Sequence, residues 1–266
     1  MNYQHIDLDI KAATAYLTMQ RPEVHNAFDD QMIAELIDAL ETVDNNPSLR
    51  VLVLRAEGRN FSAGADLNWM RSMASKNFDE NIEDAGQLSA LMERLDQLSK
   101  PTIAVVQGAA FGGAVGLAAC CDIVLAAPTS KFCLSEVKIG LIPAVISPYV
   151  MRALGVRQSR RFMLTAEVIS AEQALQFGLV HEVTDALEQR LAELVQQLLN
   201  NSPAAVTAAK RLVLDLEQRP LDPECRQITI ERIAAIRVSA EGQEGLNAFL
   251  EKRSPAWQHT PSEESE

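Results

Sequence analysis

The sequence lacks the features of a membrane or exported protein. None of its apolar runs approaches the length needed to span a membrane, and the first ten residues, MNYQHIDLDI, contain neither the basic nor the apolar region of a signal peptide. The same segment is too acidic for a transit peptide. These absences predict a cytoplasmic protein without a membrane partner.

Cysteine clusters and excess positive charge are also missing. The formal net charge is −12 at pH 7 and the pI is near 4.9, which argues against a nucleic-acid partner because such a partner normally requires a basic face. The cysteines have no metal-ligand spacing, so we expect reduced buried thiols and no metal site. They are Cys120, Cys121, Cys133 and Cys225.

What the chain does have is enough apolar sequence for a sizeable core. Of its 266 residues, 47% are hydrophobic, which suits one large domain or one domain with a short appendage. Apolar runs bounded by Pro or Gly predict strands, and apolar residues at helical spacing predict helices, giving an α/β fold. The predicted strands are 3–10, 13–19, 51–56, 102–106 and 122–127; the predicted helices follow the cap residue Asp29 and cover 82–98, a short stretch ended by Gly178, 187–199, 203–216 and 223–240.

Two glycine-containing turns expose backbone to a ligand. Gly112 and Gly113 fall where the strand 102–106 is expected to lead into a helix, and Gly64 lies among small residues after the strand 51–56. Glycine allows close approach to the main chain, and the first N–H groups of a helix have no partners within it. If one N–H group from each turn donated to the same carbonyl oxygen of a ligand, the two would form an oxyanion hole.

A lone carboxylate, Glu136, follows in an apolar setting. Burial there would raise its pKa, which suits a group that gives and takes protons near neutral pH. Glu136 could equally cap a helix or pair with Lys138 or Arg152. Its apolar neighbours are Phe132, Cys133, Leu134, Val137, Ile139, Leu141 and Ile142.

Three motifs together resemble one known family. FSAGADL, QGAAFGGAVGLAACCDIVLA and FCLSEVKIGLIP resemble the crotonase superfamily, also called the enoyl-CoA hydratase/isomerase family, and the resemblance runs from RPEVHNAF to EGLNAFLEKRSP. It implies a crotonase-like spiral of ββα repeats with a helical C-terminal trimerisation region. By matching positions, it implies that the N–H groups of Ala65 and Gly113 form the oxyanion hole and that Glu136 is the catalytic carboxylate.

The chain departs from the family at one catalytic position. Hydratases of the family use a second glutamate three residues after the second motif glycine, and this chain has Gly116 there. Hydration by the usual pair of carboxylates is therefore in doubt, and either Glu136 serves both steps or an unidentified residue helps.

The resemblance also implies a site for coenzyme A (CoA). A basic residue near the CoA phosphates matches Arg21, and the remaining candidates for contact with CoA or substrate lie around the two turns. They are Val24, His25, Ala27, Ala63, Asp66 and Leu67. For His25, a position without a chemical role is favoured over a role in catalysis. The CoA thioester is expected as substrate, with no separate cofactor.

The C-terminal part is expected to complete the site through assembly. Phe249 and Lys252 match an aromatic residue near the acyl chain and a lysine near the CoA phosphates, often from a neighbouring subunit. We therefore expect a homotrimer or a dimer of trimers. The predicted division is a spiral core with the CoA and acyl site at 1–200, an oligomerisation region at 201–257 and a disordered tail at 258–266.

Within the family, the chain most resembles bacterial hydratases of 3-methylglutaconyl-CoA in leucine degradation, or of the longer isohexenylglutaconyl-CoA. The free carboxylate of such a substrate calls for a cation, and Arg71, Lys76, Lys138 and Arg152 are candidates, the first two in a mobile segment expected to cover the acyl pocket. The alternatives are an enoyl-CoA isomerase with one base, hydration of an unbranched enoyl-CoA, a non-catalytic acyl-CoA binder and, against the acidic charge, an RNA-binding module.

Overall fold

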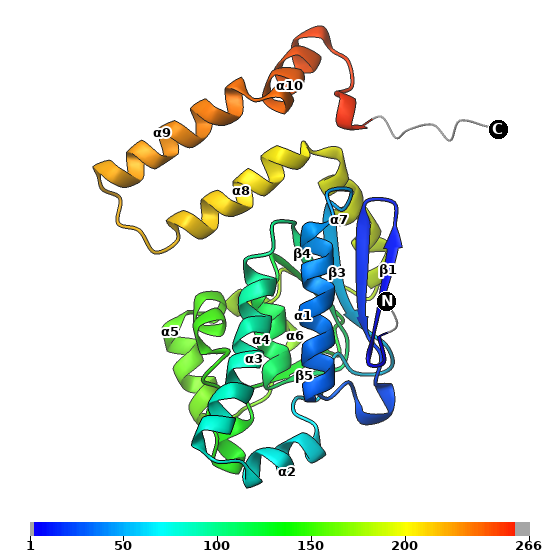
Figure 1. The fold of residues 1–266 in the computed structure, drawn as a ribbon, viewed down its shortest axis with the longest axis vertical. Coiled ribbons are helices and arrows are strands. Elements are labelled where there is room, and N and C mark those ends of the chain that lie inside the picture. The colour runs from blue at the N-terminus through cyan, green and yellow to red at the C-terminus, as the bar shows by residue number, and fades with distance from the viewer. Residues whose placement is uncertain (1–2, 259–266) are drawn as a thin grey trace, which may run out of the picture.

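A six-stranded sheet forms the centre of the computed structural model, which describes residues 3–258 (Figure 1). The strands lie in the order β1-β2-β3-β4-β6-β9, and only the β1–β2 pair is antiparallel. Their bounds are β1 Ile6–Lys11, β2 Thr14–Met19, β3 Val51–Ala56, β4 Thr102–Val106, β6 Ile123–Ala126 and β9 Glu182–Val183. A second sheet contains β5 Ala109–Phe111, β7 Lys131–Cys133 and β8 Ile169–Ser170.

The central strands are apolar throughout because both faces of the sheet are covered. In β3, Leu52 and Leu54 belong to one buried cluster, whereas Val51 and Val53 belong to a second cluster on the opposite face. The first cluster includes α1 Asp30–Asn45, α3 Phe78–Asp96, α4 Gly113–Cys120, α5 Ser147–Thr165 and α6 Ala171–Phe177; the second includes α7 Leu187–Asn200.

The chain order repeats a ββα unit. β4, β5 and α4 follow one another, and β6, β7, the short 3₁₀ helix η2 Glu136–Ile139 and α5 repeat that order. In each repeat the first strand joins the main sheet and the second joins the small sheet. The predicted spiral of ββα repeats is therefore confirmed.

Three helices extend beyond the core at one end of the molecule (Figure 1). They are α8 Pro203–Leu216, α9 Pro223–Val238 and α10 Ala240–Glu251. Among their described residues only Cys225 and Ala248 are buried. Their exposed apolar residues are Val213, Ile230, Ile233, Val238, Leu246, Phe249 and Leu250, a composition that suits the predicted association between subunits. The trimer itself stays a prediction.

Some predicted boundaries differ from the structure. The helix predicted from residue 82 begins at Phe78, because Asn77 and Glu80 form a capping box. The segment around Arg71 and Lys76, expected to be mobile, includes the helix α2 Leu67–Ser75, and its mobility stays a prediction. The helix predicted for 223–240 is interrupted at Ser239, whose hydroxyl accepts from the N–H of Gly242 and so starts α10.

Two further predictions concern the C-terminal part. The disordered tail predicted at 258–266 stays a prediction, and its first residue, Gln258, lies in the 3₁₀ turn η3 Ala256–Gln258 and donates to the carbonyl of Asn200. Residues 259–266 lie outside the described residues. The division into core and oligomerisation region stays a prediction, although α7 ends at Asn200.

Candidate active site

Hydrogen bonds on either side of Ala65 fix the first turn. Phe28 N–H donates to the carbonyl of Gly64 at 2.7 Å, and Asp66 N–H donates to the carbonyl of Phe28 at 2.8 Å. The N–H of Ala65, between them, has no acceptor within residues 3–258. The turn therefore presents one unpaired backbone donor.

Gly112 and Gly113 form the second turn. Gly112 precedes α4 with φ 55° and ψ −123°, a conformation that side chains disfavour, and its N–H donates to the carbonyl of Cys133. Gly113 is the first residue of α4, and its N–H has no acceptor in the described part of the chain. The predicted strand-to-helix turn is present, with the short strand β5 inserted before it.

The two turns and Glu136 lie in one place. A methyl group built on Gly112 would lie 3.3 Å from Oε1 of Glu136 and 4.0 Å from Cα of Gly64. A methyl group on Gly64 would lie 3.2 Å from the carbonyl oxygen of Phe111. The structure thus brings the turns that carry the predicted donors, Ala65 and Gly113, beside the predicted carboxylate.

The carboxylate of Glu136 is half-buried and incompletely paired. Burial raises its pKa, although a hydrogen bond from its own backbone N–H opposes the shift. Its Oε2 is buried and has no hydrogen-bond partner among the residues that the structure describes. Among the described residues Glu136 forms an ion pair with neither Lys138 nor Arg152, and Arg152 pairs instead with Asp96 and Glu217. One oxygen of the carboxylate is therefore desolvated without a hydrogen-bond donor to stabilise its charge.

The apolar setting predicted for Glu136 exists on one side only. Phe132, Cys133 and Leu134 are buried, whereas Ile139, Leu141 and Ile142 are exposed. Glu136 therefore lies where the buried strand β7 gives way to an exposed loop. This position explains how its carboxylate is desolvated yet close to the protein surface.

The place of the second family glutamate is filled by apolar side chains. A Cβ on Gly116 would lie 2.3 Å from Cγ2 of Ile146 and 3.1 Å from Sδ of Met92. Both residues are fully buried, with exposed fractions of 2% and 0%. Without rearrangement, no side chain fits at residue 116. Sequence reasoning noted Gly116 but missed Ile146 and Met92, which are 30 and 24 residues from it.

Arg21 points into the protein. Its guanidinium contacts Oδ2 of Asp29 at 2.8 Å, Oδ2 of Asp66 at 3.2 Å and the carbonyl of Ala27 at 2.7 Å, and only 13% of its side chain is exposed. Arg21 therefore holds the turn that contains Ala65, while a contact with CoA phosphates stays a prediction.

Asp66 shapes the same turn. Its carboxylate accepts from the N–H groups of Asn68 and Trp69 and so caps α2. Burial alone would raise the pKa of Asp66, but these N–H groups and Arg21 outweigh it and lower the pKa. Asp66 therefore remains ionised in the folded protein near neutral pH.

Five other predicted contact residues lie around these turns. Val24, His25 and Ala27 precede α1, and the N–H of Ala63 donates to the carbonyl of His25 at 2.9 Å. His25 and Ala63 are exposed, and His25 has a positive φ of 56°. Leu67, at the start of α2, is 69% exposed. The structure groups these residues, and their contact with CoA stays a prediction.

Asn26 is a site residue that sequence reasoning missed. It is fully buried; its Oδ1 accepts from the N–H of Arg21 at 2.7 Å, and its Nδ2 donates to the carbonyls of Glu57 and Asn60 at 2.9 Å. It thereby ties the loop before α1 to the loop after β3. The only signal in the sequence was an Asn in a loop, which tolerates the observed positive φ of 54°.

The structure does not bring Phe249 and Lys252 to this site. Both belong to the end of α10, whereas α2, which begins two residues after Ala65, lies at the opposite end of the molecule (Figure 1). Phe249 is 81% exposed. If these residues act at a site of this kind, it is one on another subunit, as the resemblance implied.

Of the four cations considered for a substrate carboxylate, three are engaged. Lys76 pairs with Asp84 at 2.7 Å, Arg152 forms the ion pairs described above, and Arg71 donates to the side chain of Asn68. Lys138, on η2 with Glu136, is exposed and has no ion pair with another described residue. Lys138 is thus the most available of the four.

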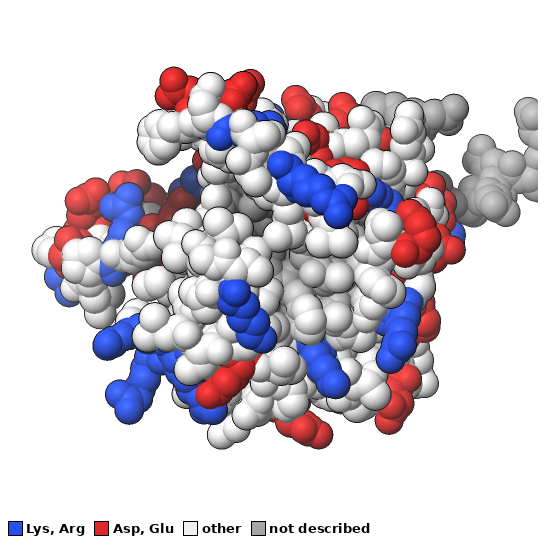
Figure 2. Space-filling view, turned by 90° about the horizontal axis from the view of Figure 1, so that it is seen from below, with Lys and Arg blue, Asp and Glu red and all other residues white. Residues whose placement is uncertain are grey.

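The face at the α2 end is mostly uncharged, with Lys and Arg side chains spread across it and Asp and Glu side chains mostly toward its edges (Figure 2). This distribution contrasts with the net charge of −12 for the whole chain. Cations on this face would favour an anionic ligand such as a phosphorylated one. Residues 3–258 contain no group of three or more His, Cys, Asp or Glu side chains arranged to hold a metal ion.

None of the helices within the described ranges is both long and apolar enough to cross a membrane.

Two unpaired backbone donors beside a carboxylate of raised pKa define a class of enzyme that stabilises a developing oxyanion and moves protons. The family described as Enoyl-CoA hydratase/isomerase matches residues 9–260, and the chain belongs to this family. As a member it is an enzyme of the enoyl-CoA hydratase/isomerase type.

Relatives of known sequence or structure agree with this assignment. The 2,3-dehydroadipyl-CoA hydratase of Escherichia coli is 32% identical over 90% of this chain and 92% of its own, and the 1,2-epoxyphenylacetyl-CoA isomerase of Escherichia coli is 34% identical with the same coverage. The crystal structure of an enoyl-CoA hydratase from Shewanella pealeana is 50% identical, covers 96% of both chains and superposes with a TM-score of 0.94.

Proposed function

We propose that the protein hydrates a branched enoyl-CoA whose acyl chain carries a free carboxylate, with 3-methylglutaconyl-CoA as the substrate. In this proposal Glu136 is the only catalytic carboxylate of the enzyme. The observation that carries this proposal is the position of Glu136 beside Gly112, with one oxygen unpaired. The relative from Escherichia coli named for 2,3-dehydroadipyl-CoA supports a substrate of this kind, since adipyl is also a diacid.

The proposed chemistry begins at the thioester. Its carbonyl oxygen accepts hydrogen bonds from the N–H groups of Ala65 and Gly113, each contributing on the order of 3 kcal/mol to stabilising the enolate. Ionised Glu136 takes a proton from water while the water oxygen bonds to C3, and the electron pair of the double bond moves to the thioester oxygen. Glu136 then returns that proton to C2, so that one water is added in total.

Glu136→Gln tests this role. Glutamine has nearly the same shape but cannot take the proton, so we expect turnover to fall by at least about 10³-fold while acyl-CoA binding is retained. The matched control is Glu188→Gln, because Glu188 is an exposed residue of α7 on the other face of the sheet. Unimpaired turnover of the Glu136 variant would exclude the proposed mechanism.

Lys138 is the proposed partner of the free carboxylate of the substrate. Lys138→Gln should raise KM for 3-methylglutaconyl-CoA by about tenfold, the effect of losing one charge-assisted hydrogen bond, and leave crotonyl-CoA unaffected. Arg71→Gln is the comparison, because Arg71 already donates to Asn68. Equal effects on both substrates would remove Lys138 from the proposal.

The second candidate is an enoyl-CoA isomerase, and the packing at Gly116 favours it. Moving a double bond needs a single base, which takes a proton from C2 and returns it at C4. No second catalytic glutamate fits at residue 116, because Ile146 fills the space that its side chain would need. Absorbance of the enoyl thioester, with products identified by mass, separates the two. A gain of one water with 3-methylglutaconyl-CoA supports hydration, and a shifted double bond without mass change in a 3-enoyl-CoA supports isomerisation. Inactivity toward every ester indicates a binder.

A further inference from the structure

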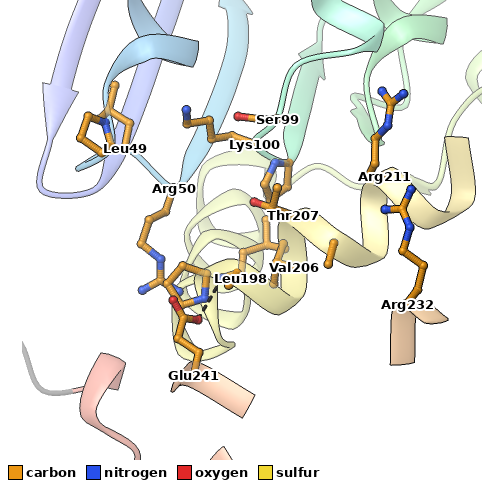
Figure 3. A pocket seen from close by; sticks show the side chains of 15 residues that line it. Leu49, Arg50, Ser99, Lys100, Leu198, Val206, Thr207, Arg211, Arg232 and Glu241 are labelled. Carbon is orange, nitrogen blue, oxygen red and sulfur yellow. Dashed lines mark hydrogen bonds between the residues drawn. The ribbon is translucent and has the colours of Figure 1, made fainter. Parts of the chain in front are cut away.

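A cavity lies at the end of the main sheet opposite the candidate active site. It measures about 520 Å³ and lies between α8 and the residues that precede β3 and β4, among them Arg50 and Pro101 (Figure 3). Ala65 and Gly113 follow the other ends of these strands, and a strand of this length spans roughly 17–20 Å. A ligand in this cavity is therefore remote from Glu136 of the same subunit.

The cavity is cationic in an acidic protein. The described residues that line it include Arg50, Lys100, Arg211 and Arg232 but only one acidic residue, Glu241. Two further carboxylates contact these cations from outside the lining, Asp44 beside Lys100 and Asp215 beside the arginines of α8 and α9. Four cations against three carboxylates leave one positive charge without a partner.

The uncompensated charge lies at one end of the cavity. Arg211 of α8 and Arg232 of α9 lie at this end of the cavity (Figure 3). They share the carboxylate of Asp215, at 3.0 Å and 2.6 Å, and Arg211 also donates to Gln97. One arginine would suffice to neutralise Asp215. Thr207 is an exposed residue that lines the cavity one helical turn before Arg211, so its hydroxyl is free to bind a ligand.

The other end is already balanced. Glu241 of α10 accepts from the hydroxyl of Ser202 and the N–H of Ala204, and it attracts Arg50 electrostatically. Nε of Arg50 is buried and has no partner within the described ranges. The apolar walls in between come from Leu49, Pro101, Leu198 and Val206. The cavity thus combines a charged end with an apolar body.

We propose that this cavity binds a small organic anion, with its carboxylate or phosphate at Arg211, Arg232 and Thr207 and its apolar chain against the walls. Guanidinium groups recognise both kinds of oxyanion, and a cavity of this size is typical of small-molecule sites. The position of the site, away from Glu136, suits a ligand that is not the reacting substrate.

Isothermal titration calorimetry of the full chain tests the site with three probes of equal chain length. Hexanoate and hexyl phosphate supply the two oxyanions, and hexan-1-ol supplies the chain alone. We expect at least one anion to bind and the alcohol not to bind. Arg211→Gln and Arg232→Gln should each weaken binding at least tenfold, whereas Arg219→Gln, an exposed arginine outside the cavity, should not. The preferred anion identifies the head group.

A second variant separates binding from folding. Thr207→Val keeps every ion pair between α8 and α9 and removes only the hydroxyl, so we expect anion binding to weaken about threefold to tenfold with an unchanged Tm. Titration is repeated with saturating crotonyl-CoA on the Glu136→Gln protein. Failure of both anions to bind, insensitivity to all three cavity variants, or displacement by crotonyl-CoA would each overturn the proposal.

Discussion

Adding a single methyl group at Gly116 tests why the second glutamate is missing. In Gly116→Ala the new Cβ would lie 2.3 Å from Cγ2 and 2.8 Å from Cβ of Ile146, well inside van der Waals contact. Overpacking of a buried position typically costs about 1–3 kcal/mol. Alanine also favours a helix over glycine by about 1 kcal/mol, so the net loss expected is about 0–2 kcal/mol.

Gly86 provides the matched control for this substitution. It lies in α3, is exposed, and a Cβ there would meet no other atom within 4 Å. Gly86→Ala should therefore stabilise the protein by about 1 kcal/mol. Because the helix propensity is common to both variants, the difference between their free energies of unfolding isolates the clash, about 1–3 kcal/mol. Urea unfolding followed by circular dichroism measures both.

A double-mutant cycle assigns the clash to Ile146. In Ile146→Ala protein, which lacks Cγ2, the cost of Gly116→Ala should fall by at least about 1 kcal/mol. The reasoning is refuted if Gly116→Ala is as stable as Gly86→Ala, or if the two substitutions are additive. The first result would mean that residue 116 has room for a side chain, and the second that Ile146 is not what the new methyl group meets.

Two further predictions concern the carboxylate and its turn. Burial raises the pKa of Glu136, so the stability associated with its protonated form is present below the unfolded-state pKa and is lost as pH rises through the folded-state pKa. The stability of Glu136→Gln minus that of the native protein should therefore be greater at pH 8 than at pH 4. Thermal unfolding of both proteins at both pH values measures this difference. An equal difference at the two pH values would contradict the assigned burial. Gly112→Ala forces a side chain into φ 55°, ψ −123° and places it 3.3 Å from Oε1 of Glu136. We expect a loss of about 1–3 kcal/mol in stability and at least tenfold in kcat, and native kinetics would argue against the placement of Glu136.

Much of the fold follows from local sequence patterns. Alternating and continuous apolar runs located the strands of the main sheet because side-chain direction in a strand depends only on neighbouring residues. The helix ends were less well predicted, since the capping box of Asn77 and Glu80 and the interruption at Ser239 depend on particular side-chain hydrogen bonds. These bonds are local, but apolar periodicity does not reveal them.

The sequence alone also indicated Ala65, Gly113 and Glu136 as candidate site residues, through two glycine turns, one isolated glutamate and the family resemblance. Only the tertiary structure decided how they lie together, that there is no space for a side chain at residue 116, and that Arg21 faces inward. The physical reason is that each of these facts rests on contacts between residues far apart in the chain, such as Gly116 with Ile146 and Arg21 with Asp66. Close packing sets those contacts, and local sequence does not specify them.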